Sequence, residues 1–235
     1  RRQKLGQVVF QEGLGSMLDK TERLAVVAGK LAERIGAAAD KNDVIRTAQL
    51  SKADLVTSMV CEFTELQGVM GREYALLGGE TPAVAQGIYE HYLPRFSGDE
   101  LPVSTAGRLV AIADKLDNIT ATFSRGLIPS GSQDPYALRR QAQGVVQILA
   151  ESDYPLALDE LFAIAMEALA IAPEKQPELK CALQDFFGGI QYRVDLTRPS
   201  GNRVSGLVLA DGRRVTPETS LVVGMNAYRL AQLQA

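Results

Sequence analysis

Apolar residues recur at helical spacing along most of this chain, and the pattern continues to Phe187. A recurrence every three to four residues gives each helix one apolar face, and such faces pack together into a bundle. From Ile190 onward apolar and polar residues alternate, which is typical of strands. The sequence therefore predicts a mainly α protein with a small C-terminal β-rich segment, α+β overall, divided into a helical domain (1–187) and a β-rich tail (188–235).

Composition excludes several classes of protein. The chain has 235 residues, of which 46% are hydrophobic and 23% charged, as is ordinary for a soluble globular protein with its own core. The net charge of -3 gives no overall attraction to nucleic acid, so any RNA contact must be a local basic patch. Cys61 and Cys181 lie far apart without a CxxC partner, which argues against a zinc site or disulfide framework. A reducing, cytoplasmic location is expected.

The ends of the sequence carry little targeting information. No apolar run is long enough to cross a membrane, and the first residues do not form the apolar core of a signal peptide. The chain begins without Met and within an apolar pattern, so we expect a fragment of a longer protein.

The segment 50–70 is predicted to be a long amphipathic helix, central to the domain, because Leu55, Met59 and Phe63 recur at helical spacing. Cys61 within it is expected to pack in the core. Two interpretations of its start remain open. Ser51 and Asp54 have the spacing of a capping box, the commoner outcome for such residues. Alternatively, Asp54 is what is left of a metal or phosphate site.

Capping and stop signals predict the other helices. Thr81 with Pro82, and Asp134 with Pro135, each combine an N-cap residue with a first-turn proline. Ser104 is expected to start another long helix. The remaining helices follow from apolar spacing, and the full set of predicted ranges is 19–35, 44–50, 83–92, 104–126, 134–149 and 156–170. In the tail, Asp211 and Gly212 predict a hairpin turn.

Few residues offer chemistry. There is one histidine, and neither a nucleophile motif nor a glycine-rich phosphate loop is present. Asp54, His91 and Asp114 lie on three predicted helices and could be metal ligands, since hydrolytic sites draw imidazole and carboxylate groups from separate elements. Spacing alone favours a structural interpretation, in which Asp54 caps a helix, His91 packs beside Tyr92 and Asp114 is solvated. A helical wheel places Asp114 near solvent and Asp117 beside the apolar stripe.

Arg125, Arg139 and Arg140 flank the loop that contains the sequence IPSGSQD and form the best local basic patch. Guanidinium groups suit contacts with RNA phosphates, although exposed arginines are more often simply solvated.

Several long strings of this chain are specific enough to indicate a family. They are FQEGLGSMLDK at 10–20, LSKADLVTSMVCEFTELQGVMGREY at 50–74, EHYLPR at 90–95, ADKLDN at 113–118 and GSQDPYALRR at 131–140. Through them, residues from about 4 to 187 resemble the HD-like helical domain in the beta subunit of the bacterial tetrameric glycyl-tRNA synthetase. The resemblance implies an HD-like helical bundle.

The resemblance implies a degenerate HD site. Active HD phosphohydrolases bind metal through a His, a His-Asp pair and a later Asp, whereas the pair position here is Ala53 and Asp54. The later Asp would be Asp114, His91 could at best be an extra ligand, and no metal is expected because two imidazoles are missing. The fragment would be non-catalytic and need no cofactor. Its expected partners are glycine tRNA and the alpha subunit, which uses ATP and Mg²⁺ for aminoacylation. No association with a membrane is expected.

The tail resembles a different family. Residues 186–230, with the strings PSGNRV, DGRRV and NAYRL, are similar to part of the C-terminal domain of the 5'-nucleotidase family. A junction of two families within 183–189 predicts a chimera, unless the tail is an insertion with accidental similarity. Two alternative functions therefore stay open: a metal-dependent HD-type phosphohydrolase, and a nucleotide-binding fragment of a 5'-nucleotidase-like protein.

Overall fold

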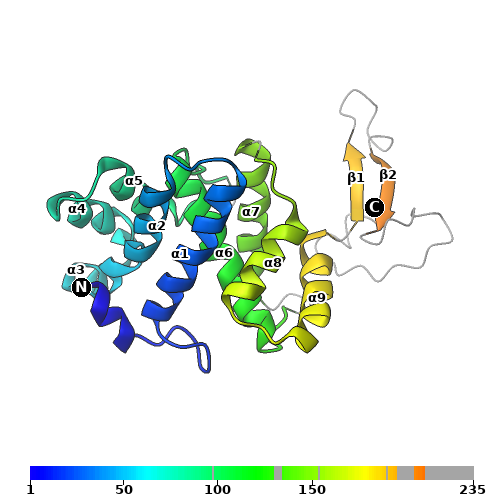
Figure 1. The fold of residues 1–235 in the computed structure, drawn as a ribbon, viewed down its shortest axis with the longest axis horizontal. Coiled ribbons are helices and arrows are strands. Elements are labelled where there is room, and N and C mark those ends of the chain that lie inside the picture. Colours follow the sequence, from blue (N-terminus) through cyan, green and yellow to red (C-terminus); the bar gives the residue numbers. More distant parts are fainter. Residues whose placement is uncertain (97, 130–133, 153, 189, 195–203, 210–235) are drawn as a thin grey trace, which may run out of the picture.

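The computed structural model describes residues 1–96, 98–129, 134–152, 154–188, 190–194 and 204–209 (Figure 1). This part of the chain is mainly helical, in agreement with the predicted class. The α-helices are α1 (Met17–Arg34), α2 (Lys41–Leu50), α3 (Ser58–Glu62), α4 (Val69–Leu77), α5 (Pro82–Glu90), α6 (Thr105–Ser124), α7 (Leu138–Ser152), α8 (Leu158–Ala168) and α9 (Gln176–Gly188). Short 3-10 helices are η1 (Arg2–Gln7), η2 (Ala53–Val56), η3 (Thr64–Leu66) and η4 (Pro173–Lys175).

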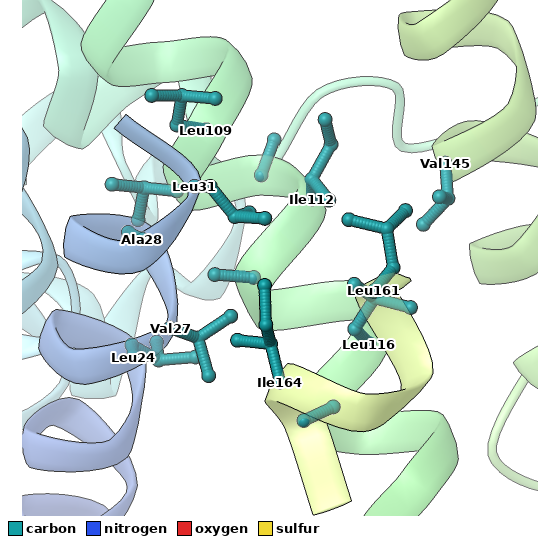
Figure 2. Packing of buried hydrophobic residues seen from close by; sticks show 14 of the residues in the cluster. Leu24, Val27, Ala28, Leu31, Leu109, Ile112, Leu116, Val145, Leu161 and Ile164 are labelled. Atoms are coloured by element: carbon teal, nitrogen blue, oxygen red, sulfur yellow. The ribbon is translucent and has the colours of Figure 1, made fainter. Parts of the chain in front are cut away.

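Helix α6 is the centre of the bundle. Nearly all of its residues are buried, because α1, α5, α7 and α8 surround it. Figure 2 shows an apolar layer in which side chains of α1, α6, α7 and α8 meet. Removing this apolar area from water is the main force that holds the helices together. The labelled members of the layer are Leu24, Val27, Ala28, Leu31, Leu109, Ile112, Leu116, Val145, Leu161 and Ile164.

Three helix starts follow the capping chemistry of their sequences. The Thr81 hydroxyl accepts a hydrogen bond from the Val84 N–H, and the Ser104 hydroxyl accepts one from the Gly107 N–H, so the predicted cap at Thr81 and the predicted helix start at Ser104 are confirmed. Before α1, Ser16 and Asp19 form a complete capping box. These starts depend on residues within one turn, which is why local sequence predicts them.

The prediction of one long helix over 50–70 is wrong. Helix α2 ends at Leu50, and the segment then divides into η2, α3, η3 and the start of α4. The predicted capping box is also absent, because the Ser51 hydroxyl donates to the Ala48 carbonyl and the Asp54 carboxylate accepts the Gly68 N–H at 2.7 Å. Gly68 has a φ of 81°, a conformation that favours glycine, and it precedes α4. Long-range contacts thus override the local periodicity.

Two smaller expectations also differ from the structure. Helix α7 begins at Leu138 and not at Asp134, since Ala137 has a positive φ of 52°. Asp134 still caps it, because its carboxylate accepts the N–H groups of Leu138 and Arg139. Cys61, expected in the core, is exposed because the long helix that would have buried it does not form.

Beyond α9, strands β1 (Ile190–Val194) and β2 (Val204–Leu209) pair antiparallel, with Ile190 opposite Leu209. The predicted turn at Asp211 and Gly212, and the strands expected after it, lie outside the described residues. Among the helices that are described, none is long and apolar enough to cross a membrane.

We predict that Leu116→Ala lowers the free energy of unfolding by about 2–5 kcal/mol, because it leaves a cavity among α1, α6 and α8. Leu116 is fully buried. Urea unfolding followed by circular dichroism measures the change. Val146→Ala, at an exposed site on α7, is the control and should change stability by less than about 0.5 kcal/mol. Equal effects of the two substitutions would contradict the central position of α6.

Candidate functional site

Asp114 lies at the centre of a buried group of charges. Its Oδ1 is 3.0 Å from the Lys20 ammonium, and its Oδ2 is 2.8 Å from the Lys52 ammonium. Asp114, Lys20 and Lys52 are only 6%, 2% and 4% exposed. The wheel-based placement of Asp114 near solvent is therefore wrong, because α1 and the segment after α2 cover that side of α6.

Asp117, one turn further along α6, extends the group. Its Oδ2 lies 2.9 Å from the Lys20 ammonium, and its Oδ1 accepts a 2.7 Å hydrogen bond from Arg23 Nε. We call Lys20, Arg23, Lys52, Asp114 and Asp117 the buried charge cluster. Since these residues come from three segments far apart in sequence, the cluster ties α1, the residues after α2 and α6 together.

The cluster sets the ionisation of its members. Burial alone would raise the pKa of Asp114, but the ammonium groups of Lys20 and Lys52 outweigh it and hold that pKa well below its usual range. In the same way, Lys20 and Arg23 overcome burial and lower the pKa of Asp117. For Lys52 burial prevails and lowers its pKa, despite the attraction of Asp114.

Asp54, the second predicted site carboxylate, is buried on η2 and is held by a different partner. Its Oδ2 accepts the Gly68 N–H at 2.7 Å. Burial raises the pKa of Asp54, and the Gly68 hydrogen bond and the Lys52 charge only partly oppose this. Lys52 is thus close enough to act electrostatically on both Asp54 and Asp114.

His91 is fully buried at the end of α5. Its Nδ1 lies 2.5 Å from the Ile88 carbonyl oxygen, which can only accept, so Nδ1 carries the proton. Burial, and then the charge of Lys52, lower the pKa of His91 well below its usual value, which keeps the ring neutral. The ring packs against Tyr92 with centroids 3.8 Å apart, as the structural interpretation predicts.

The donors present do not fit a divalent metal ion. Both oxygens of Asp114 already face ammonium groups, and Asp54 accepts a backbone N–H. Only His91 Nε2 offers an imidazole lone pair, whereas hydrolytic sites need several ligands around one open position. In the described part of the chain, no three His, Cys, Asp or Glu side chains come together in a way that could hold a metal.

A cavity of about 360 Å³ opens beside the cluster. Lys52, Asp114 and Lys115 line its inner part, and Arg95 and Arg140 contribute to its wall. Lys115 is 5% exposed and donates to the Leu93 carbonyl at 2.7 Å. Burial lowers the pKa of Lys115 to about 8. Four cationic side chains therefore line this cavity together with one carboxylate.

The three arginines of the predicted basic patch do not share one site. Arg140 is exposed at the start of α7 and lines the 360 Å³ cavity, and Arg139 beside it is also exposed. Arg125 caps the end of α6, where it lines a different cavity with residues of α9. The structure thus brings Arg140 next to the charge cluster and leaves Arg125 apart from that cavity.

Sequence reasoning missed the lysines. Lys20, Lys52 and Lys115 all lie inside the strings that carry the family resemblance, and Lys52 is two residues from Asp54. The available signal was a lysine beside the apolar stripe of a predicted helix, as at Lys115.

Comparisons with known proteins point to one family. The family model described as glycyl-tRNA synthetase beta subunit matches residues 1–195. The glycine–tRNA ligase beta subunit of Halothermothrix orenii is 54% identical over 170 residues, which are 72% of this chain and 25% of that protein. The beta subunit of Desulfitobacterium hafniense is 50% identical over 79% of this chain, and that of Syntrophus aciditrophicus is 46% identical over 90% of it.

The chain therefore belongs to a family of aminoacyl-tRNA synthetase subunits. This family is the glycyl-tRNA synthetase beta subunit family. It spans 25% to 31% of the length of these relatives. The family match continues to residue 195, past the range 183–189 in which a junction was expected. The 5'-nucleotidase resemblance of the tail stays a prediction.

We predict that Asp114→Asn lowers the free energy of unfolding by about 3–5 kcal/mol, because it leaves Lys20 and Lys52 without their shared counter-charge. Chemical denaturation measures this loss. Asp40→Asn, an exposed carboxylate on the same bundle, is the matched control and should have little effect. A second substitution, Lys52→Met, should recover part of the loss in Asp114→Asn, whereas simple additivity would contradict the pairing.

The cluster also predicts how stability depends on pH. Because Asp114 and Asp117 have lower pKa values in the folded than in the unfolded chain, their stabilisation is present above the unfolded value of about 4 and is lost as the pH falls through the folded values. Unfolding measured from pH 6 to about pH 2 should show this loss. The Asp114→Asn variant should have a shallower acid slope than the wild type, and an identical slope would contradict the assignment.

Proposed function

We propose that this chain is a non-catalytic module of the glycyl-tRNA synthetase beta subunit that contacts tRNA and organises the subunit. The observation that carries this proposal is the pairing of Asp114 with Lys20 and Lys52. In an HD-like scaffold this carboxylate would bind the hydrolytic metal, and here ammonium groups neutralise it. In this proposal the ion pairs of Asp114 stabilise the bundle, and the carboxylate does not serve as a metal ligand.

The support for RNA contact comes from charge and family. Arg139 and Arg140 are exposed side by side at the start of α7, and Arg95 lines the same cavity as Arg140. Guanidinium groups make strong bonds to phosphate, and such contacts position a protein on RNA without reading sequence. The relatives are named glycine–tRNA ligase beta subunits, so glycine tRNA is the RNA we propose.

The proposal extends to the assembled enzyme. We infer an association with the alpha subunit in the cytoplasm, with ATP and Mg²⁺ used there and not by this module. Arg125, apart from the cavity, would serve as a further phosphate contact.

The two alternative functions have weaker support. A metal-dependent HD-type phosphohydrolase would need more ligands than Asp54, His91 and Asp114 supply, since both oxygens of Asp114 face ammonium groups and one oxygen of Asp54 accepts the Gly68 N–H. A nucleotide-binding function of the tail rests on residues that lie mostly outside the described ranges.

We predict that Arg139→Ala combined with Arg140→Ala weakens binding of glycine tRNA by about tenfold or more and lowers the slope of log affinity against log salt by about two. Gel-shift titration at several salt concentrations measures both quantities.

A double variant with the same change in charge, Lys4→Ala with Lys180→Ala, is the control. Equal weakening by both pairs would mean that only net charge matters. Binding that is unchanged in the arginine pair would refute the proposed contact surface.

A further inference from the structure

The inner part of the 360 Å³ cavity holds more positive charge than its carboxylate can balance. Asp114 is shared by Lys20 and Lys52, and Arg95 is paired with Asp99 at 2.8 Å. In the described part of the chain, Lys115 and Arg140 form no ion pair, and the hydrogen bonds of their side chains go to backbone carbonyls. Two cationic groups thus line one cavity without a counter-ion among the residues that the structure describes.

These groups lie at different depths. Lys115 and Lys52 are almost fully buried, whereas Arg140 is exposed at the mouth. Gly144 on α7 allows this arrangement, because a Cβ there would lie 2.9 Å from Lys115 Cε. An anion that enters between Arg140 and Lys115 would meet donors at both ends of its path.

We infer that this cavity binds the terminal phosphate of a phosphate monoester, without a metal ion. Its volume is at the lower end of the range of roughly 300–1,000 Å³ that is usual for small-ligand pockets, which suits a mononucleotide. An internal phosphodiester is flanked by sugars on both sides and cannot reach buried ammonium groups as a terminal phosphate can. The lowered pKa of Lys115 agrees with a buried ammonium group that lacks a close counter-ion.

The terminal phosphate has two possible sources, a free nucleotide or the 5' end of an RNA. The inference goes beyond the proposed function, because a free nucleotide would bind whether or not the module contacts tRNA.

Calorimetric titration of the 235-residue chain with AMP, in EDTA, tests the inference. We expect saturable binding that adenosine does not reproduce, or tighter binding of a short 5'-phosphorylated RNA than of the same RNA with a 5'-hydroxyl. The first result identifies a free nucleotide as the source, and the second identifies an RNA end.

Variants locate the site. Arg140→Ala should weaken phosphate-dependent binding about tenfold or more, while Lys4→Ala, an exposed cation of the same charge that does not line the cavity, should leave it unchanged. Lys115→Met should abolish it in protein whose melting temperature shows that it is folded. No saturation by AMP together with no effect of the 5' phosphate overturns the inference, as does equal weakening by Arg140→Ala and Lys4→Ala.

Discussion

Asp114 forms ion pairs with two lysines at once, and these pairs fix how α1 and the segment after α2 lie against α6. One carboxylate on α6 meets an ammonium group from α1 and another from the segment after α2, and all three groups are removed from water. Transfer of such charges out of water is costly, so each is tolerated only because the others are present. The apolar layer beside them supplies most of the stabilisation, but the cluster fixes which faces of α1 and α6 lie against each other.

Helices that depend on local chemistry could be predicted from the sequence. Thr81 and Ser104 start α5 and α6 as expected, because a cap and the turn it begins are adjacent in the chain. The segment 50–70 could not be predicted in this way. Its apolar spacing is helical, yet the hydrogen bond from Gly68 to Asp54 joins residues 14 positions apart and requires the chain to fold back.

The candidate site was predictable only in part. The packing of His91 against Tyr92 was expected, whereas the burial of Asp114 between two ammonium groups and the hydrogen bond from the Gly68 N–H to Asp54 were not. A helical wheel describes one helix against an unspecified core, and it cannot indicate that Lys20, from a distant part of the chain, covers Asp114. The placement of Arg140 beside this region and of Arg125 at another cavity likewise depends on how α6 and α7 pack.

Because both oxygens of Asp114 face ammonium groups, no single substitution of a neighbouring lysine turns this cluster into a metal centre without a loss of stability. A ligand such as histidine in place of Lys20 or Lys52 alone would remove one positive charge before any metal ion could replace it. The intermediate chain would keep a buried carboxylate with too little compensation, and that state is costly. Buried salt bridges of this kind therefore oppose the evolution of a metal site, because each single replacement of a lysine by a metal ligand gives a less stable protein.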